Sequence, residues 1–358
     1  MKKKVVVGMS GGVDSSVAAY LLKEQGYDVM GITMQIWQEE AEHVQEEQGG
    51  CCGLDAVEDA RAVAVKLGIP HYVLNFRDVF REKVMDYFIE EYLHGRTPNP
   101  CNACNRYVKW EALLDRAREI GADYIATGHY AQIAQLDNGR YAVASSVTAE
   151  KDQTYALYAL TQEQLSHTLM PIGAYRKEEV RRIATDLGLL VADKKDSQDI
   201  CFLPDGDYGT FLEQQAKDRL PPPGDFVLED GTVVGQHKGI SYYTIGQRRG
   251  LQVALGKRIF VKEIDVCRNR IVLAEDPSLY TDHLYANTLN LMAVEQFRDG
   301  DRFRAKIRYS HRGSDCRIQL TGEDEIRLDF DEPVRAVTPG QAVVLYQGDY
   351  VAGGGVIR

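Results

Sequence analysis

The residues best suited to chemistry form a glycine-rich loop near the start of the chain. The loop reads Gly8-Met9-Ser10-Gly11-Gly12-Val13-Asp14-Ser15 and follows an apolar, β-branched segment at residues 5–7. Adjacent glycines let a backbone approach a ligand closely, and the helix expected at residues 15–25 would point its positive end at that ligand. Together with the serine hydroxyls, these features suit a phosphate chain, so the loop predicts a nucleotide site.

This loop differs from a Walker loop because the Gly-Lys-Ser/Thr ending is missing. Asp14 stands where that lysine would be, and a carboxylate beside phosphates indicates Mg²⁺ between them. A plain glycine turn between a strand and a helix is the alternative. The two serines that follow Asp14 favour the nucleotide interpretation.

Three of the seven cysteines form the second group. Cys101 and Cys104 have C-x-x-C spacing, and Cys201 follows far along the chain. Such a pair suits a redox couple, half of a zinc site or part of an iron–sulfur site. The flanking Asn99 and Pro100 predict an exposed loop, and the helix expected just beyond it favours the thiolate. Ordinary buried cysteines are the alternative, above all for Cys201.

The other cysteines carry weaker signals. Cys51 and Cys52 are adjacent and cannot face the same way on a regular element, while Cys267 and Cys316 belong to no motif that indicates a function. An odd number of cysteines without a signal peptide argues against a disulfide framework.

A third group is a basic stripe, defined as Arg302, Arg304, Lys306 and Arg308. On a strand, these alternate residues would share one face and leave apolar residues on the other. The stripe suits a phosphate backbone, and Tyr309 could stack on a base. A solvated outer strand face is the alternative.

Composition sets the broad class. The chain has 358 residues, of which 44% are hydrophobic, and a formal net charge of −11. This length predicts two or three domains, and the charge argues against a nonspecific polyanion binder while leaving room for a local basic patch. No apolar run reaches membrane-spanning length. The lysines near the start of the chain are soon followed by the glycine-rich loop and not by the apolar segment and cleavage site of a signal peptide, so we expect a cytoplasmic protein.

Strand and helix signals alternate from residue 4 to about residue 190. The expected strands are 5–7, 29–33, 72–75 and 124–127, and the expected helices are 15–25, 57–67, 79–92, 107–119 and 176–187. This rhythm predicts an α/β fold with a doubly wound, mostly parallel sheet. Ligands bind beyond the carboxyl ends of such strands, where the glycine loop, Met34 and Gly128 fall.

A proline-rich break at residues 218–225 separates this region from short β-like runs. Three prolines there bar a helix and a central strand alike. We predict a nucleotide-binding catalytic domain at 1–206, a small β-rich central domain at 207–278 and a β-barrel-like C-terminal domain at 279–358. Segments 151–153 and 235–251 are rich in polar residues and glycine, and they look like binding loops. Their composition alone does not indicate which ligand they bind.

Taken together, these motifs resemble the bacterial tRNA-specific 2-thiouridylase (MnmA) family of N-type ATP pyrophosphatases. The shared motifs are the glycine loop and residues 95–100, 104–105, 126–130, 151–153, 199–202, 243–248, 339–342 and 353–355. They cover nearly the whole chain in the same order, which makes the resemblance specific.

The resemblance implies that ATP lies on residues Gly8 to Ser15, with Met34 and Gly128 at its adenosine part. The enzyme would attach AMP to the C2 oxygen of the wobble uridine and then replace that oxygen by sulfur. Cys201 matches the persulfide-carrying cysteine and Cys104 the nucleophile. Cys104 would release the sulfur by forming a transient disulfide with Cys201.

The resemblance also implies a tRNA surface and a sulfur donor protein or cysteine desulfurase as partner. Asn99, Pro100 and Cys101 would border the target base. The positions that match tRNA contacts are His129, Lys151, Asp152, Gln153, Arg308, Tyr309 and Gln341. We expect a monomer.

Cys101 departs from the common family pattern, in which Asp occupies this position. With Cys104 and Cys201 it gives three thiolates, which suit a [4Fe–4S] cluster whose open iron binds sulfide. Cluster-dependent thiolation is therefore an alternative to the persulfide route. Two hypotheses from different functional classes also remain, a small-molecule ATP-adenylating synthetase and a non-catalytic RNA-binding protein.

Overall fold

The computed structural model describes residues 2–36, 54–194, 200–203 and 206–358. The chain forms two compact units. The first comprises Met1–Val84, Cys101–Gly206 and Gly348–Val351, and the second comprises Met85–Pro100, Asp207–Gln347 and Ala352–Arg358. Cys51 and Cys52 lie outside the described residues.

A five-stranded sheet in the order β3-β2-β1-β4-β7 is the centre of the first unit, and its neighbouring strands run parallel. The strands are β1 (Lys4–Gly8), β2 (Asp28–Gln35), β3 (His71–Asn75), β4 (Tyr124–Ala126) and β7 (Thr168–Leu169). This order confirms the predicted doubly wound α/β fold. The four strands expected from the sequence are all present, and β7 is an addition.

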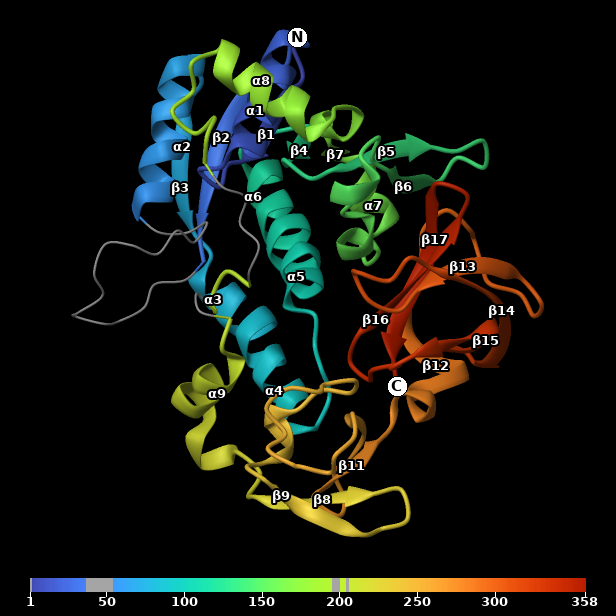
Figure 1. The fold of residues 1–358 in the computed structure, drawn as a ribbon. Helices are drawn as coiled ribbons and strands as arrows, with labels where there is room; N and C mark the ends of the chain where they lie inside the picture. Colours follow the sequence, from blue (N-terminus) through green and yellow to red (C-terminus); the bar gives the residue numbers. More distant parts are fainter. Residues whose placement is uncertain (1, 37–53, 195–199, 204–205) are drawn as a thin grey trace. The chain divides into compact units, whose positions relative to one another are not determined.

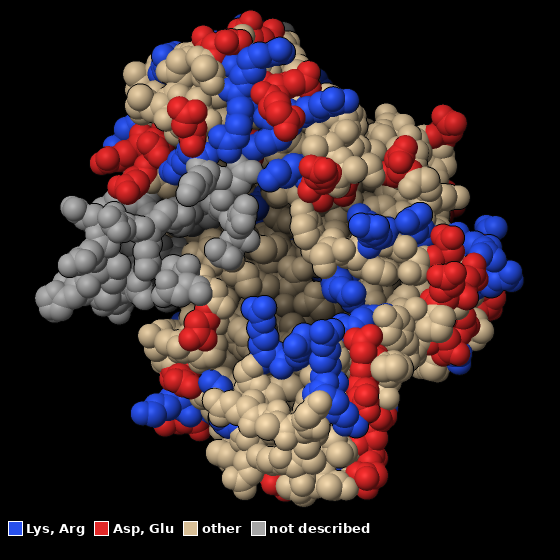
Figure 2. Space-filling model, in the orientation of Figure 1, with Lys and Arg blue, Asp and Glu red and all other residues tan. Residues whose placement is uncertain are grey.

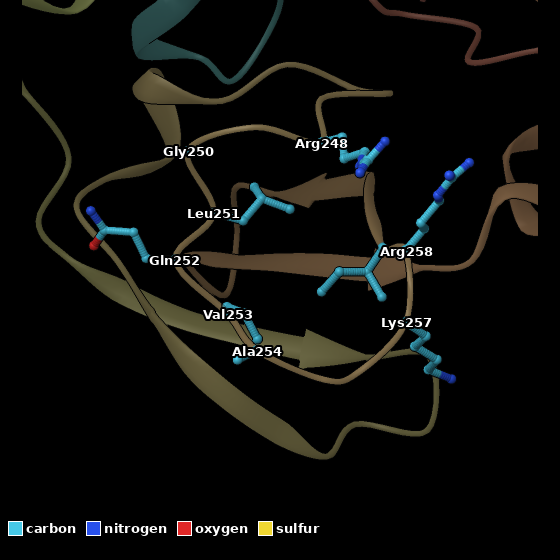
Figure 3. Close-up of a pocket in the computed structure, with 9 residues that line it drawn as sticks. Arg248, Gly250, Leu251, Gln252, Val253, Ala254, Lys257 and Arg258 are labelled. Atoms are coloured by element: carbon cyan, nitrogen blue, oxygen red, sulfur yellow. The ribbon is translucent and has the colours of Figure 1, made fainter.

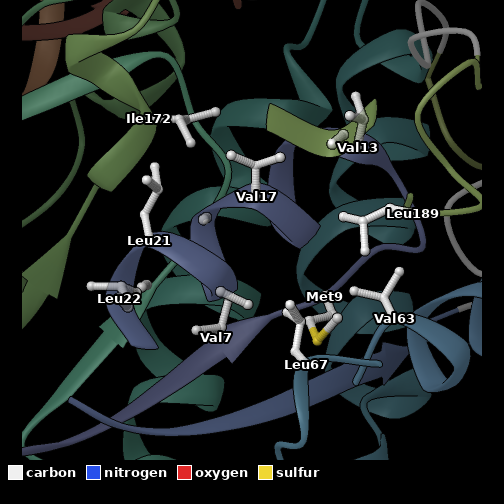
Figure 4. Close-up of a cluster of buried hydrophobic side chains, with 14 of the residues drawn as sticks. Val7, Met9, Val13, Val17, Leu21, Leu22, Val63, Leu67, Ile172 and Leu189 are labelled. Atoms are coloured by element: carbon white, nitrogen blue, oxygen red, sulfur yellow. The ribbon is translucent and has the colours of Figure 1, made fainter. Parts of the chain in front are cut away.

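Helices cover both faces of this sheet (Figure 1). They include α1 (Val13–Glu24), α2 (Leu54–Leu67), α6 (Leu113–Glu119) and α8 (Lys177–Asp186). Val5 and Val7 belong to one buried cluster with α1, α2 and α8, as Figure 4 shows for Val7, Val17 and Val63. Since side chains alternate along a strand, Val6 faces the opposite side, and α6 packs there next to β4.

Antiparallel strands β5 (Ala131–Gln135) and β6 (Tyr141–Ser145) follow β4. The sequence pattern did not predict these two strands. Tyr350, at the start of β17, pairs with Ala144 of β6, so residues 348–351 belong to the first unit.

The second unit contains a four-stranded sheet in the order β10-β11-β8-β9. Its strands are β8 (Gly224–Leu228), β9 (Val233–His237), β10 (Phe260–Asp265) and β11 (Arg270–Ala274). Phe226, Val261 and Leu273 lie in its core. Helices α4 (Tyr87–Leu93) and α9 (Tyr208–Ala216) also belong to this unit, and Phe88 packs edge-on against Phe211 at 5.9 Å.

The C-terminal strands close into a barrel. They are β12 (Tyr280–Leu291), β13 (Arg302–Lys306), β14 (Ser314–Gly322), β15 (Glu325–Arg335), β16 (Ala342–Gln347) and β17 (Tyr350–Ile357). β12 pairs with both β15 and β17, which closes the sheet on itself. The buried cluster inside includes Phe303, Leu328 and Leu345. This confirms the predicted β-barrel-like C-terminal region.

Candidate active site

Two loops meet at the carboxyl edge of the parallel sheet. One follows β1 and contains residues 8–12, and the other follows β4 and contains Gly128. A Cβ on Gly128 would lie only 2.5 Å from the Ser15 backbone nitrogen, and the Met34 methyl lies 3.9 Å from the place of a Cβ on Gly8. The structure thus brings together the nucleotide-site residues that the sequence placed after three different strands.

Glycine is required at Gly11 for two reasons. Its φ is +67°, and a Cβ would lie 2.4 Å from the Ala56 carbonyl oxygen of α2. Gly12 occupies the N-cap of α1 and offers no side-chain cap, which leaves the first backbone N–H groups of the helix available to an anion. The Ser15 hydroxyl accepts a hydrogen bond from the Ser10 N–H at 3.2 Å and so shapes the loop.

Asp14 is held by two residues that the sequence pattern did not indicate, Lys177 and Tyr130. The Lys177 ammonium donates to both carboxylate oxygens, at 2.8 and 2.9 Å, and the Tyr130 hydroxyl donates to Oδ1 at 2.8 Å. Lys177 is the first residue of α8, and its side chain is only 8% exposed. Asp14 therefore has a counter-ion from the protein, which supports a role in orienting the loop. Sequence spacing carries no signal for this contact.

A second lysine reaches the same loop. The Lys194 ammonium donates to the Gly11 carbonyl at 3.2 Å and pairs with Asp59 of α2 at 2.7 Å. A cation at the loop suits a polyphosphate ligand. Lys194 is the last described residue before the segment 195–199.

Cys101 and Cys104 lie at the beginning of a helix, so the prediction of an exposed loop is wrong. The helix starts as α5 (Pro100–Ala103), continues through a π-helical segment (Cys104–Ala112) and ends as α6. Proline is favoured in the first helical turn because its missing N–H is not needed there. Cys101 is exposed and Cys104 is half-buried, and their spacing places them on one helix face.

Long-range hydrogen bonds fix this helix in the first unit. The Trp110 indole donates to the Thr168 hydroxyl at 2.7 Å, and the Asn105 amide donates to the Ala156 carbonyl at 2.8 Å. π-helical turns are rare and are often found at functional sites.

Cys201 is half-buried, and its neighbour Phe202 packs edge-on against Phe80 at 5.8 Å. Within the described ranges, no three His, Cys, Asp or Glu side chains form a group that could hold a metal ion. Cys101, Cys104 and Cys201 are all among the residues searched, and the three thiols are not gathered into one such group in this structure.

The remaining described cysteines have structural or surface positions. Cys316 is buried in the barrel, and burial raises the pKa of its thiol to about 12. Cys267 is exposed.

His129 follows Gly128 and lies beside the helix that carries Cys104. Its Nδ1 is 2.7 Å from the Thr127 hydroxyl, and its ring is 5.4 Å from that of Trp110. Burial, and then the charge of Lys109, lower the pKa of His129 well below its usual 6.5. The imidazole is therefore neutral at pH 7.

The 151–153 segment is tied to the loop after β4. The Gln153 side-chain oxygen accepts a hydrogen bond from the Tyr130 N–H at 2.9 Å, and the Gln153 N–H donates to the Tyr130 carbonyl at 3.0 Å. Asp152 accepts hydrogen bonds from the backbone N–H groups of Ser146 and Thr154, each at 3.1 Å. Asp152 and Gln153 thus shape this turn, while Lys151 is half-buried at its start.

The basic stripe is shorter than predicted because β13 ends at Lys306. Phe303, Ala305 and Ile307 are buried, which confirms the alternation of faces. Arg302 pairs with Asp331, and Figure 2 shows acidic and basic side chains intermingled on this barrel. Part of the stripe is therefore already neutralised.

Arg308 and Tyr309 lie in the turn after β13. The Arg308 guanidinium donates to the Arg335 carbonyl at 2.9 Å, and Tyr309 is 53% exposed. Gln341 donates to the carbonyls of Thr97 and Pro98, at 2.9 and 3.2 Å, directly before Asn99 and Pro100. Gln341 thus supports the segment that leads to Asn99.

A pocket of about 390 Å³ lies in the second unit, in the module of β8 to β11. Figure 3 shows Leu251 and Val253 in it, with Arg248 and Arg258 at its edge. It includes part of the glycine-rich segment at 235–251 and none of the residues assigned to the nucleotide or the thiol chemistry. None of the helices among the described residues is long and apolar enough to cross a membrane.

Family models match almost the whole chain. A model described as a tRNA methyl transferase HUP domain matches residues 3–205, one described as a tRNA methyl transferase PRC-barrel domain matches 209–275, and one described as an aminomethyltransferase beta-barrel domain matches 281–357.

Curated relatives match over their full length. A tRNA-specific 2-thiouridylase MnmA of Lachnoclostridium phytofermentans is 62% identical over 355 residues, which is 99% of both chains. The protein of the same name from Clostridioides difficile is 55% identical over 359 residues, covering 100% of this chain and 99% of its own. A solved 4-thiouridine synthetase–RNA complex with bound ATP is 20% identical, covers 61% of this chain and 51% of its own, and has a TM-score of 0.35.

Proposed function

Because the chain belongs to the tRNA-specific 2-thiouridylase MnmA family, we propose that it replaces the C2 oxygen of the wobble uridine of tRNA by sulfur at the expense of ATP. The observation that carries this proposal is the meeting of the β1 and β4 loops around Asp14. That arrangement provides glycines, helix N–H groups and a lysine-neutralised carboxylate for an ATP polyphosphate.

The first step is adenylation. The uridine C2 oxygen attacks the α-phosphorus of ATP, the bond to the β-phosphate breaks, and pyrophosphate leaves. Gly8 to Ser15 bind the phosphates, and Met34 and Gly128 lie at the adenosine part. Mg²⁺ would accompany ATP as part of the substrate. Adenylation turns the C2 oxygen into a good leaving group.

Sulfur transfer follows through Cys201 and Cys104. The terminal sulfur of a Cys201 persulfide attacks C2, and AMP leaves with the former C2 oxygen. The Cys104 thiolate then attacks the Cys201 sulfur, which forms a Cys104–Cys201 disulfide and releases the 2-thiouridine. A thiol reductant must reduce this disulfide, and a donor protein or cysteine desulfurase must reload Cys201.

The tRNA contacts belong to this proposal. Asn99, Pro100 and Cys101 border the target base, and His129, Lys151 and Gln341 lie on segments that contact RNA or support such contacts. The exposed ring of Tyr309 suits stacking on a base. We also propose that the first domain ends at residue 206 and the second at residue 278. The protein is proposed to be a monomer located in the cytoplasm.

Mass analysis of tRNA nucleosides after incubation with ATP, Mg²⁺, a thiol reductant, and cysteine with a cysteine desulfurase, which delivers sulfur as a persulfide, tests the function. We expect 2-thiouridine from the native protein, none from Cys104→Ser or Cys201→Ser, and unchanged yield from the matched control Cys267→Ser. Full activity of both serine variants would refute the thiol mechanism. A methylated nucleoside would instead support the chemistry in the family-model description.

The same incubation distinguishes tRNA thiolation from the competing functions. ATP cleavage with a small carboxylate and without tRNA would indicate a small-molecule synthetase, and RNA binding without ATP cleavage would indicate a non-catalytic protein. Thiolation by colourless, iron-free protein would support the persulfide route over the cluster route.

A further inference from the structure

A continuous set of hydrogen bonds joins the 151–153 segment to the nucleotide loop. Gln153 makes two hydrogen bonds to the Tyr130 backbone, at 2.9 and 3.0 Å. The Tyr130 hydroxyl in turn donates to Asp14 Oδ1 at 2.8 Å. Tyr130 is thus one residue whose backbone contacts one segment and whose side chain contacts the other.

The surroundings leave this tyrosine little room to move. Tyr130 is 2% exposed and belongs to the buried cluster of the first unit. The backbone of Gly173 packs closely against the next residue, Ala131. A Cβ added at Gly173 would lie 1.8 Å from the Ala131 carbonyl oxygen. The Lys177 ammonium lies 5.6 Å from the centre of the Tyr130 ring while it pairs with Asp14. Since the interior is close-packed, a shift of the Tyr130 backbone moves its hydroxyl as well.

We propose that Tyr130 is a positioning residue that couples RNA docking at residues 151–153 to the Asp14 carboxylate of the nucleotide loop. This inference rests on the proposed function, because it takes the 151–153 segment as an RNA contact. RNA that fixes this segment also fixes Gln153 and, through it, the Tyr130 backbone. The tyrosine hydroxyl then holds Asp14 in the geometry that receives ATP, so each ligand strengthens the binding of the other.

The coupling is measurable as a ratio of dissociation constants. The affinity of full-length protein for a non-hydrolysable ATP analogue is determined with and without saturating tRNA, and the reciprocal experiment measures tRNA with and without the analogue. Reciprocity requires the same factor in both directions. Coupling factors between two sites are typically about 5 to 150.

Tyr130→Phe removes only the hydroxyl and keeps the buried ring. We expect the coupling factor to fall to within about twofold of unity, while affinity for the analogue alone changes less than about threefold. The matched control is Tyr124→Phe in the same sheet, whose hydroxyl accepts a hydrogen bond from Lys3 at 2.8 Å near the other end of β1. This control should retain the native factor.

Gln153→Met provides a second route if Tyr130→Phe fails to fold. It removes the acceptor for the Tyr130 N–H and should lower the coupling factor, and any direct effect on RNA affinity cancels because the factor is a ratio. A native factor near one, an unchanged factor in Tyr130→Phe, or an equal loss in Tyr124→Phe would overturn the inference. Thiolation is assayed in parallel: coupling without thiolation would refute the proposed function alone, and thiolation with unchanged coupling in Tyr130→Phe would refute this inference alone.

Discussion

The Lys177 ammonium lies 2.8 and 2.9 Å from the two carboxylate oxygens of Asp14, although 163 residues separate them in the sequence. The lysine side chain is 8% exposed and the aspartate side chain 29%. Removal of one partner from such a pair leaves the other charge poorly compensated. The pair therefore joins the start of α8 to the nucleotide loop.

Lys177→Met should lower the free energy of unfolding by about 2 kcal/mol, because the Asp14 charge loses its counter-ion while remaining partly solvated. Urea denaturation measures this effect. Asp14→Asn combined with Lys177→Met should cost less than the sum of the single changes. The control Lys257→Met breaks the exposed pair with Glu275 and should cost less than about 1 kcal/mol. Equal effects of Lys177→Met and Lys257→Met would contradict the structural role.

Gly128→Ala should weaken ATP binding by about tenfold or more, because its Cβ would lie 2.5 Å from the Ser15 nitrogen and would push the two loops apart. Titration with a fluorescent ATP analogue measures the change. Gly322→Ala is the control, since its Cβ would make an ordinary contact at 3.4 Å. Normal ATP affinity in Gly128→Ala would show that the loops tolerate separation.

Cys316 should resist alkylation by iodoacetamide at pH 8 in the folded protein, because burial raises its thiol pKa to about 12. Peptide mass analysis measures the labelling of each cysteine. Cys101, which is exposed, should be labelled under the same conditions, and Cys316 only after denaturation. Rapid labelling of Cys316 in native protein would show that the barrel opens.

His129 should make the protein less stable as the pH falls below about 6.5. Its folded-state pKa is lowered, so the unfolded chain takes up the proton first, and proton uptake favours unfolding. One such proton contributes at most about 1.4 kcal/mol per pH unit. Urea denaturation between pH 7.5 and 5 should show a shallower decline for His129→Asn than for the native protein. The difference isolates His129 because the other histidines titrate in both proteins, and parallel curves would contradict the assignment.

Charge reversals within the basic stripe should differ in their effect on RNA binding, because Arg302 already pairs with an acidic residue. The double variant Arg304→Glu with Arg308→Glu should bind tRNA more weakly. The slope of the logarithm of the binding constant against the logarithm of the salt concentration should become shallower by about one for each phosphate that the variant no longer binds. Arg302→Glu should have a smaller effect, because Asp331 already neutralises Arg302. Arg116→Glu, on the exposed surface of α6, is the control. Affinity that is unchanged over several salt concentrations would remove the stripe from the interface.

Local signals in the sequence were sufficient for the main framework. The apolar run at residues 5–7, the glycines after it and the helical spacing beyond it predicted β1, the nucleotide loop and α1, because such patterns act over a few residues. The same kind of signal misled at Pro100, where it predicted a loop. Proline disrupts helix interiors but suits the first turn, and the sequence alone did not show which position it held.

The alternating α/β order and the glycine-rich turn between β1 and α1 follow from the order of residues along the chain. Only the three-dimensional structure shows that Lys177 neutralises Asp14 and that Gln153 is hydrogen-bonded to the Tyr130 backbone. The same holds for the ion pair between Asp331 and Arg302. These contacts join residues far apart in the chain. Their existence depends on how close-packed elements bring charges and hydrogen-bonding groups within about 3 Å, which no local pattern encodes.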